Sequence, residues 1–517
     1  MEWLFWVLAA AFGCLGYFVL RIVTVIWWKP LQVKKCFESQ GVRGPPYRLL
    51  NGNFADMVRM NTQAKSTPIP WSHDIVPRVL PYYHHWTKTY GKDFIYWVGS
   101  KPRLNVPHPE LIKEILSNKF GHYENISSNP LGRQLVGQGL VGLRGEKWVQ
   151  HRRIINPAFH LDFLKGMVPT IVESTANMLE KWGKLVLSGA EEVEVLKEFC
   201  NLTADVISRT ALGSSYAEAK HIFNLQDQQM LLTAELVLSV YVPGFRFLPT
   251  RKNRQRWKLE KEIRKCMRQV IEARERTADI EQSGSYGTDL LGLMMSAKNK
   301  RVGGKLQDVR MTTEEIIDEC KTFYFAGHET TSILLTWTII LLGMHQDWQD
   351  RGRKEVLEVC GKNVVPDADS VNHLKIVGMI LNEALRLYPP AVFLQRQAVK
   401  PMQLGRLSIP AGTQLLLPIL AIHHDQCLWG NDANEFNPAR FSEGIAKAVK
   451  HPLAFMPFGF GPRICVGQNF ALLEAKVVLA MILQRFSFVT SPSYAHAPVM
   501  VVTVRPQHGA QVILHMN

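Results

Sequence analysis

The residues between Pro457 and Gly467 place one cysteine in a segment that favours thiolate chemistry. The segment reads PFGFGPRICVG, and a strongly helical pattern starts directly after it at Gln468. Glycine lets the backbone take unusual dihedral angles and approach a flat ligand. A thiolate at the start of a helix is stabilised by backbone N–H groups and the helix dipole, and Arg463 adds positive charge near Cys465. These features are compatible with a functional thiolate. They are equally compatible with a buried free cysteine in a glycine-rich turn.

A second group of polar residues interrupts an otherwise apolar helix. The segment AGHETT covers residues 326–331. Thr312 and Glu315 have the spacing of a capping box for the start of this helix. The hydroxyl of Thr330 can bond to a backbone carbonyl and loosen the helix locally. The alternative is a solvated helical face, and the apolar residues on both sides of the segment argue against it.

Two charged residues share a face of another predicted helix. Glu383 and Arg386 are three positions apart in an apolar helix that ends at Pro389 and Pro390. Such a pair is common on protein surfaces, so the spacing alone carries little information.

Helical periodicity dominates from residue 47 to 517, without a repeat, a low-complexity tract or a clear linker. It predicts helices over Val168–Leu187, Val195–Leu212, Trp257–Arg276, Thr313–Gly343, Asp347–Cys360 and Asn469–Gln484. Pro169 is compatible with the first of these because proline is tolerated in a first helical turn. Short β-type segments occur at Phe94–Val98, Arg103–Val106, Gln403–Ile409, Thr413–Leu417 and Gln511–His515. We therefore expect one large, mainly α domain with small β-sheets.

The N-terminal residues predict a membrane anchor. Trp3–Leu20 is an uncharged apolar run that continues past Arg21 to Trp28, and about 20 apolar residues span a bilayer core. Basic residues follow this run, so the positive-inside rule places the body in the cytosol. The alternative is a cleaved signal peptide, but the run is too long and lacks a positive n-region. We expect three regions: a transmembrane anchor over 1–28, a basic, proline-containing linker over 29–46, and the large domain over 47–517.

Composition narrows the class of protein. The chain has 517 residues, and 46% of them are hydrophobic, which excludes a disordered or fibrous chain. The net charge is +15, but no long basic tract exists, so an anionic membrane or an acidic protein partner fits better than nucleic acid. The eight cysteines are widely spread without a C-x-x-C pair, so we expect reduced thiols rather than a disulfide framework.

The cysteine segment resembles the haem-ligand loop of the cytochrome P-450 superfamily. It matches the pattern F-x-x-G-x-R-x-C-x-G at Phe458, Gly461, Arg463, Cys465 and Gly467. The resemblance implies the cytochrome P-450 fold, mainly α with small β-sheets, behind a single N-terminal transmembrane helix. It also implies haem b as the cofactor, with Cys465 as the axial thiolate ligand of the iron.

Further segments resemble the other motifs of the superfamily in the expected order. Residues 326–331 resemble the oxygen-activating motif, in which Thr330 and Glu329 would help to deliver protons. Glu383 and Arg386 resemble the E-x-x-R motif, whose partner would be Arg440. The resemblance implies that these three form a structural charge network that holds the haem loop. Ala439 replaces the usual acid before this arginine, a departure that we expect to matter little.

Residues 148–152 resemble the W-x-x-x-R segment that faces a haem propionate. The resemblance assigns Trp148, Arg152, Arg396 and Arg463 to the propionates, because a buried carboxylate needs a cationic partner. His151 lies between the first two, and we interpret it as a histidine on the helix surface. Finer segments resemble a clan of plant microsomal members that contains secologanin synthase and brassinosteroid, cytokinin and gibberellin hydroxylases: residues 40–48, 145–148, 155–160, 202–210 and 467–471.

The resemblance implies a haem-thiolate monooxygenase that hydroxylates a lipophilic small molecule, such as a plant terpenoid- or steroid-derived metabolite or hormone. Electrons would come from NADPH-cytochrome P-450 reductase at the endoplasmic reticulum membrane, with the catalytic domain in the cytosol. Substrate contacts would come from residues 124–141, 236–247, 323–330, 391–394 and 499–501. The alternatives are a fatty-acid hydroxylase, a haem-thiolate isomerase or dehydratase that does not need O₂, and a haem-binding electron carrier or sensor.

Overall fold

A computed structural model describes residues 2–118, 121–126, 132–213, 216–237, 244–280, 285–299 and 311–517 of the chain. The helices are α1 Glu2–Val23, α2 Lys29–Glu38, α3 Phe54–Lys65, α4 Val76–Val79, α5 Pro81–Tyr90, α6 Pro109–Ser117, α7 Arg133–Val136, α8 Gly145–Ile155, α9 Leu161–Leu187, α10 Val195–Ala211, α11 Tyr216–Val237, α12 Arg251–Ile280, α13 Leu290–Asn299, α14 Thr313–Met344, α15 Gln346–Cys360, α16 Ala368–His373, α17 Lys375–Leu387, α18 Ile419–His423, α19 Gln426–Trp429, α20 Ile445–Ala448 and α21 Gln468–Arg485. A π-helical turn, η1 Thr24–Trp28, joins α1 to α2. Short 3₁₀ turns are η2 Asn156–Phe159, η3 Phe245–Phe247, η4 Pro438–Phe441, η5 Pro452–Ala454 and η6 Gly461–Arg463.

The strands form small, separate sheets among these helices. They are β1 Ile95–Val98, β2 Lys101–Asn105, β3 Tyr123–Glu124, β4 Glu192–Glu194, β5 Leu394–Ala398, β6 Met402–Leu404, β7 Leu407–Ile409, β8 Gln414–Leu417, β9 Phe486–Thr490, β10 Pro498–Met500, β11 Val504–Pro506 and β12 Gln511–Met516. The largest sheet has the order β1-β2-β8-β5-β3, and a three-stranded sheet has the order β4-β12-β9. The hairpins β6-β7 and β10-β11 complete the set within the described residues. The expected mainly α architecture with small sheets is confirmed.

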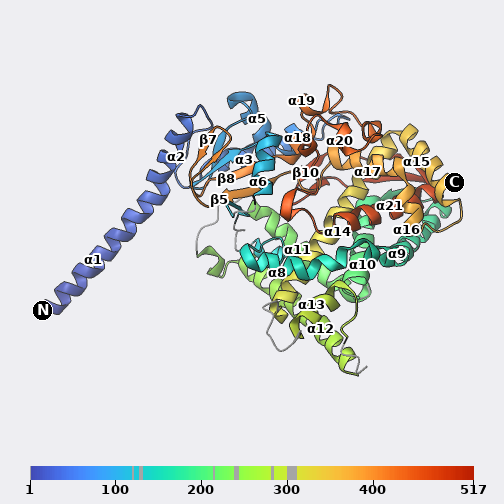
Figure 1. Ribbon diagram of the computed structural model, residues 1–517, viewed down its shortest axis with the longest axis horizontal. Helices are drawn as coiled ribbons and strands as arrows, with labels where there is room; N and C mark the ends of the chain where they lie inside the picture. The colour runs from blue at the N-terminus through green and yellow to red at the C-terminus, as the bar shows by residue number, and fades with distance from the viewer. Residues whose placement is uncertain are drawn as a thin grey trace.

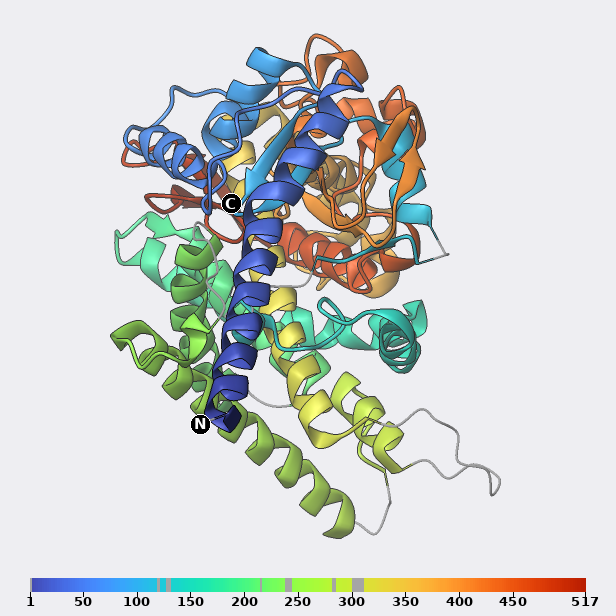
Figure 2. The ribbon, with the colours of Figure 1, turned by 90° about the vertical axis from the view of Figure 1, so that its left-hand side faces the viewer.

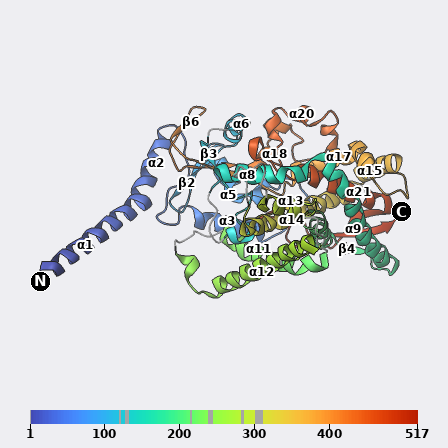
Figure 3. The same cartoon turned by 60° about the horizontal axis from the view of Figure 1, so that its bottom comes forward.

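The sheets and helices occupy different parts of the body. In Figure 1 the strands β5 and β8 lie on the side where the N-terminal helix joins, and α12 and α13 lie at the lower edge, below α11. Seen from below, α8 and α13 lie in front of α14, and the C-terminal strands lie at the far end from the anchor (Figure 3). The long helix α14 therefore runs through the middle of the molecule, between the sheets and the lower helices.

Helix α14 is the central element because almost its whole length is buried. Its start is set by the expected capping box: Thr312 N donates to Glu315 Oε2 at 2.9 Å, and Glu315 N donates to Thr312 Oγ1 at 3.2 Å. Gly327 has a packing role, since a Cβ there would lie 2.8 Å from Ile207 Cγ1 on α10. The absence of that Cβ lets α10 pack closely beside the polar segment of α14.

The N-terminal helix projects away from the body in Figure 1, and in Figure 2 it lies in front of the body. Its side chains are exposed, for example Trp3 at 78% and Phe12 at 71%, and Trp3–Glu38 is long and apolar enough to cross a membrane. The Tyr47 hydroxyl donates to the carbonyl of Ile26 at 2.5 Å and ties the start of the body to the end of the anchor. These properties fit a membrane anchor.

Two boundaries differ from the sequence-based expectation. Residues 29–38 of the predicted linker are helical as α2, which continues α1 through the π-helical turn, and Pro30 lies directly after that turn. Helix α9 begins at Leu161 instead of Val168, so Pro169 lies inside the helix and the expectation that it occupies the first turn was wrong. The remaining predicted helices begin and end within a few residues of the observed ones, apart from α12, whose start is six residues earlier than expected (257 against 251).

Candidate haem site

The Cys465 loop is a compact turn that ends where α21 begins. The backbone N–H of Cys465 donates to the carbonyl of Phe458 at 3.0 Å, which folds the loop back on itself. Ile464 N donates to the carbonyl of Gly461 at 3.1 Å and closes the turn η6. Gly467 is the N-cap of α21, so the cysteine lies just before a helix N-terminus, as the sequence indicated. This is the position in which backbone N–H groups stabilise a thiolate.

Two of the loop glycines have different reasons to be glycine. Gly461 has φ +73°, and a Cβ there would overlap the carbonyl oxygen of Leu116 at the end of α6. Gly467 has an ordinary negative φ, and a Cβ there would be only in van der Waals contact with Phe159, at 3.7 Å. The fold therefore requires glycine at 461, and no clash within the described residues requires it at 467.

Cys465 retains solvent-accessible surface, although enough protein surrounds it for burial to raise the pKa of its thiol. A backbone hydrogen bond from Gly467 and the positive charge of Arg152 partly offset this increase in the pKa of the thiol. A residue that is accessible and yet enclosed lies in a recess rather than on a convex surface. The raised pKa keeps the thiol protonated in the absence of a metal, and a metal ligand must lose that proton on binding.

Three arginines surround the loop. Arg152 Nη1 on α8 donates to the carbonyl of Ile464 at 2.8 Å. The guanidinium of Arg463 lies 4.4 Å from the ring centroid of Trp148 and donates to the carbonyl of Leu143 at 2.9 Å. Arg396 on β5 is buried, and its Nη1 donates to the adjacent carbonyl at 2.9 Å.

These arginines have little compensating charge from the protein, although Glu124 partly offsets the charge of Arg463. Burial, together with the nearby positive charge of Arg463, lowers the pKa of Arg396 to about 10. Burial also lowers the pKa of Arg463 to about 10. Within the part of the chain that the structure describes, none of Arg152, Arg396 and Arg463 forms an ion pair with a carboxylate. Buried cations without a partner are costly, so this group fits an anionic ligand with carboxylates.

The polar segment of α14 divides between two environments. Glu329 is fully buried, and Arg505 of β11 forms an ion pair with it: Arg505 Nε donates to Glu329 Oε1 at 2.7 Å, and Nη2 donates to Oε2. The Thr503 hydroxyl also donates to Glu329 Oε1. Burial alone would raise the pKa of Glu329, but the hydrogen bonds and charge of Arg505 lower it overall. Thr330 Oγ1 instead donates to the carbonyl of Ala326 at 2.8 Å, within its own helix.

Glu383, Arg386 and Arg440 lie together in one buried network. Arg386 makes a bidentate pair with Glu383, with Nε–Oε2 and Nη2–Oε1 both 2.7 Å, and Arg440 Nε donates to Glu383 Oε1 at 3.1 Å. Arg440 Nη2 also donates to Asp432 Oδ2 at 2.9 Å. Asp432 thus supplies a second carboxylate for Arg440, which directly follows Ala439.

The network reaches the cysteine loop through one histidine. Arg386 Nη1 donates to the carbonyl of His423 at 2.9 Å, and His423 Nε2 accepts from the backbone N–H of Met456 at 3.2 Å. Met456 lies directly before the cysteine segment, and its carbonyl accepts from Gly459 N at 3.0 Å. Sequence reasoning missed both Asp432 and His423, because no spacing signal links them to the motif.

The comparison with known proteins agrees with this geometry. The family model for cytochrome P450 matches residues 76–513. The chain belongs to the cytochrome P450 family. It is 50% identical over 504 residues to cytochrome P450 734A1 of Arabidopsis thaliana, covering 96% of this chain and 94% of the relative. It is 44% identical over 509 residues to secologanin synthase 2 of Catharanthus roseus, covering 98% of this chain and 96% of the relative.

A solved structure shows the same fold. The retinoic acid-bound cyanobacterial CYP120A1 aligns with a TM-score of 0.73 at 23% identity and covers 87% of this chain and 99% of its own. This cytochrome P450 is therefore an oxidoreductase with haem b as its cofactor. The unpaired arginines beside the recessed Cys465 fit a group that offers two carboxylates and an iron.

His151 is not a surface residue in this cytochrome P450, and the expectation that it is was wrong. It is buried, and its Nδ1 lies 2.6 Å from Oε1 of the fully buried Glu319 on α14. Glu319 Oε2 also accepts from the backbone N–H of Leu140 at 3.0 Å. This pair fixes α8, which carries Trp148 and Arg152, to α14.

A small apolar cluster, separate from the main core, brings together two of the segments expected to contact the substrate, 124–141 and 323–330. Leu135, Met230 and Phe325 form it, and Val136 and Val502 pack against it. These residues come from α7, α11, α14 and the turn between β10 and β11. Residues 127–131 and 238–243 of the expected segments lie outside the described residues.

Proposed function

We propose that this cytochrome P450 monooxygenase hydroxylates a lipophilic small molecule, a plant terpenoid- or steroid-derived metabolite or hormone. The observation that carries the proposal is the apolar cluster of Leu135, Met230 and Phe325, built beside the polar segment of α14 from elements far apart in the chain. Apolar side chains with a few polar groups are typical of a site for a lipophilic ligand. The similarity to a secologanin synthase supports a terpenoid-derived substrate.

Within this proposal, Cys465 would supply the thiolate that binds the haem iron, and Arg152, Arg396, Arg463 and Trp148 would hold the propionates. The bound haem supplies the activation of O₂. Phe458, Gly461 and Gly467 shape the loop that presents the thiolate. The network of Glu383, Arg386 and Arg440 holds that loop in register through His423.

Glu329 and Thr330 deliver protons to the oxygen side of the site. Glu329 is held ionised by Arg505, so it would take part by accepting a proton and passing it on. Thr330 offers a hydroxyl that can exchange its bond to Ala326 for one to a ligand. NADPH-cytochrome P450 reductase supplies the electrons. The chain is a single-pass protein of the endoplasmic reticulum membrane, with residues 1–28 as anchor, 29–46 as linker and 47–517 as the cytosolic catalytic domain.

The ligation is tested with a carbon-monoxide difference spectrum of reduced microsomes. We expect the Soret band of a thiolate-ligated haem, and we expect Cys465→Ala to abolish it. Cys427→Ala, which changes an exposed cysteine on α19, is the matched control and should leave the band in place. An unchanged band in Cys465→Ala removes that residue from the iron.

The substrate class is tested by metabolite profiling of microsomes that contain the enzyme and a reductase, over a terpenoid, steroid and fatty-acid panel. We expect hydroxylated terpenoid or steroid products that require NADPH and O₂. Products from fatty acids alone would contradict the proposed substrate class, and turnover without O₂ would indicate an isomerase or dehydratase. For Thr330→Ala we expect NADPH consumption to continue while product falls, and unchanged coupling removes Thr330 from the proton path.

A further inference from the structure

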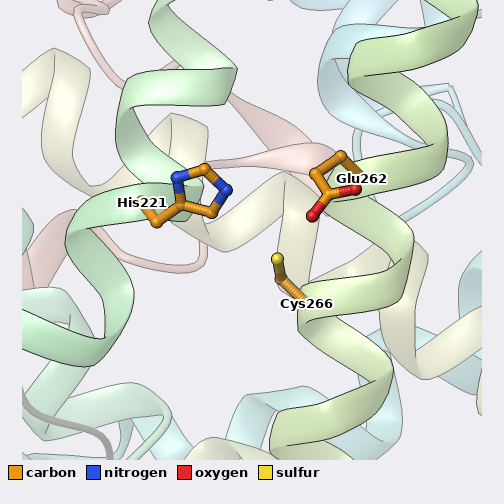
Figure 4. Close-up of side chains that lie close together, drawn as sticks. All are labelled: His221, Glu262 and Cys266. Atoms are coloured by element: carbon orange, nitrogen blue, oxygen red, sulfur yellow. The ribbon is translucent and has the colours of Figure 1, made fainter.

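Three metal-ligating side chains converge on the lower side of the molecule, outside the haem site. They are His221 on α11 and Glu262 and Cys266 on α12, and Figure 4 shows all three turned toward one another across the gap between the two helices. One ligand atom from each lies within 4.8 Å of the other two. Glu262 and Cys266 are four residues apart, so they share one face of α12.

The chemistry of the three donors selects the metal. A thiolate, an imidazole and a carboxylate are the ligand types that zinc combines, whereas calcium and magnesium take oxygen ligands. We propose that His221, Glu262 and Cys266 form a Zn²⁺ site that joins α11 to α12. Three protein ligands leave the fourth tetrahedral position for water, so the ion is exchangeable rather than permanently enclosed.

The surroundings of the site are compatible with an exchangeable ion. His221 is exposed, and Glu262 and Cys266 are half-buried, so the ion can enter from solvent. Glu262 has one loose ion pair, from Lys265 Nζ at 4.0 Å, which a metal can displace. Zinc bonds are about 2.0–2.3 Å long, so the three donor atoms, which lie within 4.8 Å of one another, must move closer together when the ion binds.

The site joins two helices that both contact α14, α11 at its polar segment and α12 nearer its start. Phe223 of α11 packs on His328, with ring centroids 5.0 Å apart, and Arg264 of α12 pairs with Asp318 at 2.6 Å. His221 is two residues from Phe223, and Glu262 and Cys266 flank Arg264. An ion at the site therefore links α11 to α12, the two helices that make these contacts with α14. It would restrict the separation of the two helices.

The test uses untagged, detergent-solubilised full-length holoprotein titrated with ZnCl₂ by isothermal calorimetry. We expect one saturable site per chain, confirmed by elemental analysis after dialysis. Cys266→Ser and His221→Ala should each weaken zinc binding at least tenfold, as loss of a ligand does. Cys427→Ser and His160→Ala change an exposed cysteine and an exposed histidine elsewhere and should bind as the wild type does.

The carbon-monoxide spectrum of each variant shows that it is folded, because the three ligands lie outside the haem site. Hydrogen exchange gives a second measurement: zinc should slow exchange in peptides from 219–233 and 258–270 of the wild type and not of Cys266→Ser. No saturable zinc site in the folded wild type would overturn the proposal. Binding that is equally strong in Cys266→Ser and His221→Ala would overturn it as well.

Discussion

Arg505 Nε lies 2.7 Å from Oε1 of Glu329, and this ion pair joins strand β11 to the middle of α14. The two residues are 176 positions apart in the chain. Glu329 is fully buried and Arg505 is 19% exposed, so the pair is shielded from solvent. The pair keeps a charged carboxylate next to Thr330 and, at the same time, fixes the hairpin β10-β11 over the polar segment of α14.

Removing either partner should destabilise the protein strongly. We expect Arg505→Gln and Glu329→Gln each to lower the free energy of unfolding by about 3–5 kcal/mol, because each leaves a buried charge unpaired. The double variant should lose less than the sum, since neither charge remains. Guanidinium unfolding at neutral pH, followed by circular dichroism, measures this. Neutral pH is suitable because the pKa of Glu329 is lowered in the folded protein. The carboxylate therefore stabilises the fold fully above the pKa that it has in the unfolded chain, and this stabilisation is lost only as the pH falls. Additive losses would show that the two side chains act independently.

Asp432 should contribute to the E-x-x-R network less than Glu383 does. Its side chain is 37% exposed, so its pair with Arg440 is partly screened, whereas Glu383 is fully buried. We expect Asp432→Ala to cost about 1 kcal/mol and to retain haem. Glu383→Ala leaves the buried Arg386 without a carboxylate and Arg440 with Asp432 alone, and it should yield little holoprotein. The ratio of the Soret band to the protein band after purification measures haem content, and equal losses in the two variants would contradict this ranking.

Gly461 should tolerate no side chain. Alanine at φ +73° costs about 1–2 kcal/mol from the left-handed backbone alone, and its Cβ would also overlap the carbonyl of Leu116. Gly189 is the matched control, with φ +82° and no atom near its Cβ position. We expect Gly461→Ala to lose haem and Gly189→Ala to lose only a few degrees of melting temperature. Similar melting temperatures and haem contents would mean that the Leu116 contact gives way easily.

Acid should destabilise the fold through buried neutral histidines. Burial, together with neighbouring positive groups, lowers the pKa of His73 and of His423 to about 3, and burial lowers that of His496 to about 4. The unfolded chain takes up protons on these residues below about pH 6.5, while the folded chain does not, so stability is lost as the pH falls through that value. Each of these histidines lowers the free energy of unfolding by about 1.4 kcal/mol for every pH unit below about pH 6.5.

The melting temperature should therefore fall from about pH 6.5 to about pH 5, where carboxyl groups contribute little. His496→Gln removes one residue that takes up a proton on unfolding. We therefore expect it to make the slope of melting temperature against pH less steep. His515→Gln, which changes an exposed histidine, should leave the slope unchanged. A flat profile in the wild type over this range would contradict the assignment.

The local motifs could be predicted from the sequence because their physics is local. The capping box of Thr312 and Glu315, the helix after Gly467 and the bidentate pair of Glu383 and Arg386 depend on residues within one helical turn. The family also followed from residues close together in the chain, since five positions in ten specify the cysteine loop. The apolar N-terminal run and the basic residues after it indicated an anchor for the same reason.

Only the tertiary structure decided which residues meet across the chain. Arg505 pairs with Glu329, Asp432 with Arg440, and His151 with Glu319, and none of these contacts has a spacing signal. His151 shows the reason most clearly: its helix pattern cannot tell a solvent-facing position from one that a distant helix covers. The convergence of His221 with Glu262 and Cys266 is of the same kind. Local chemistry determines the element and the family, whereas burial and long-range pairing depend on how α14 packs against the elements around it.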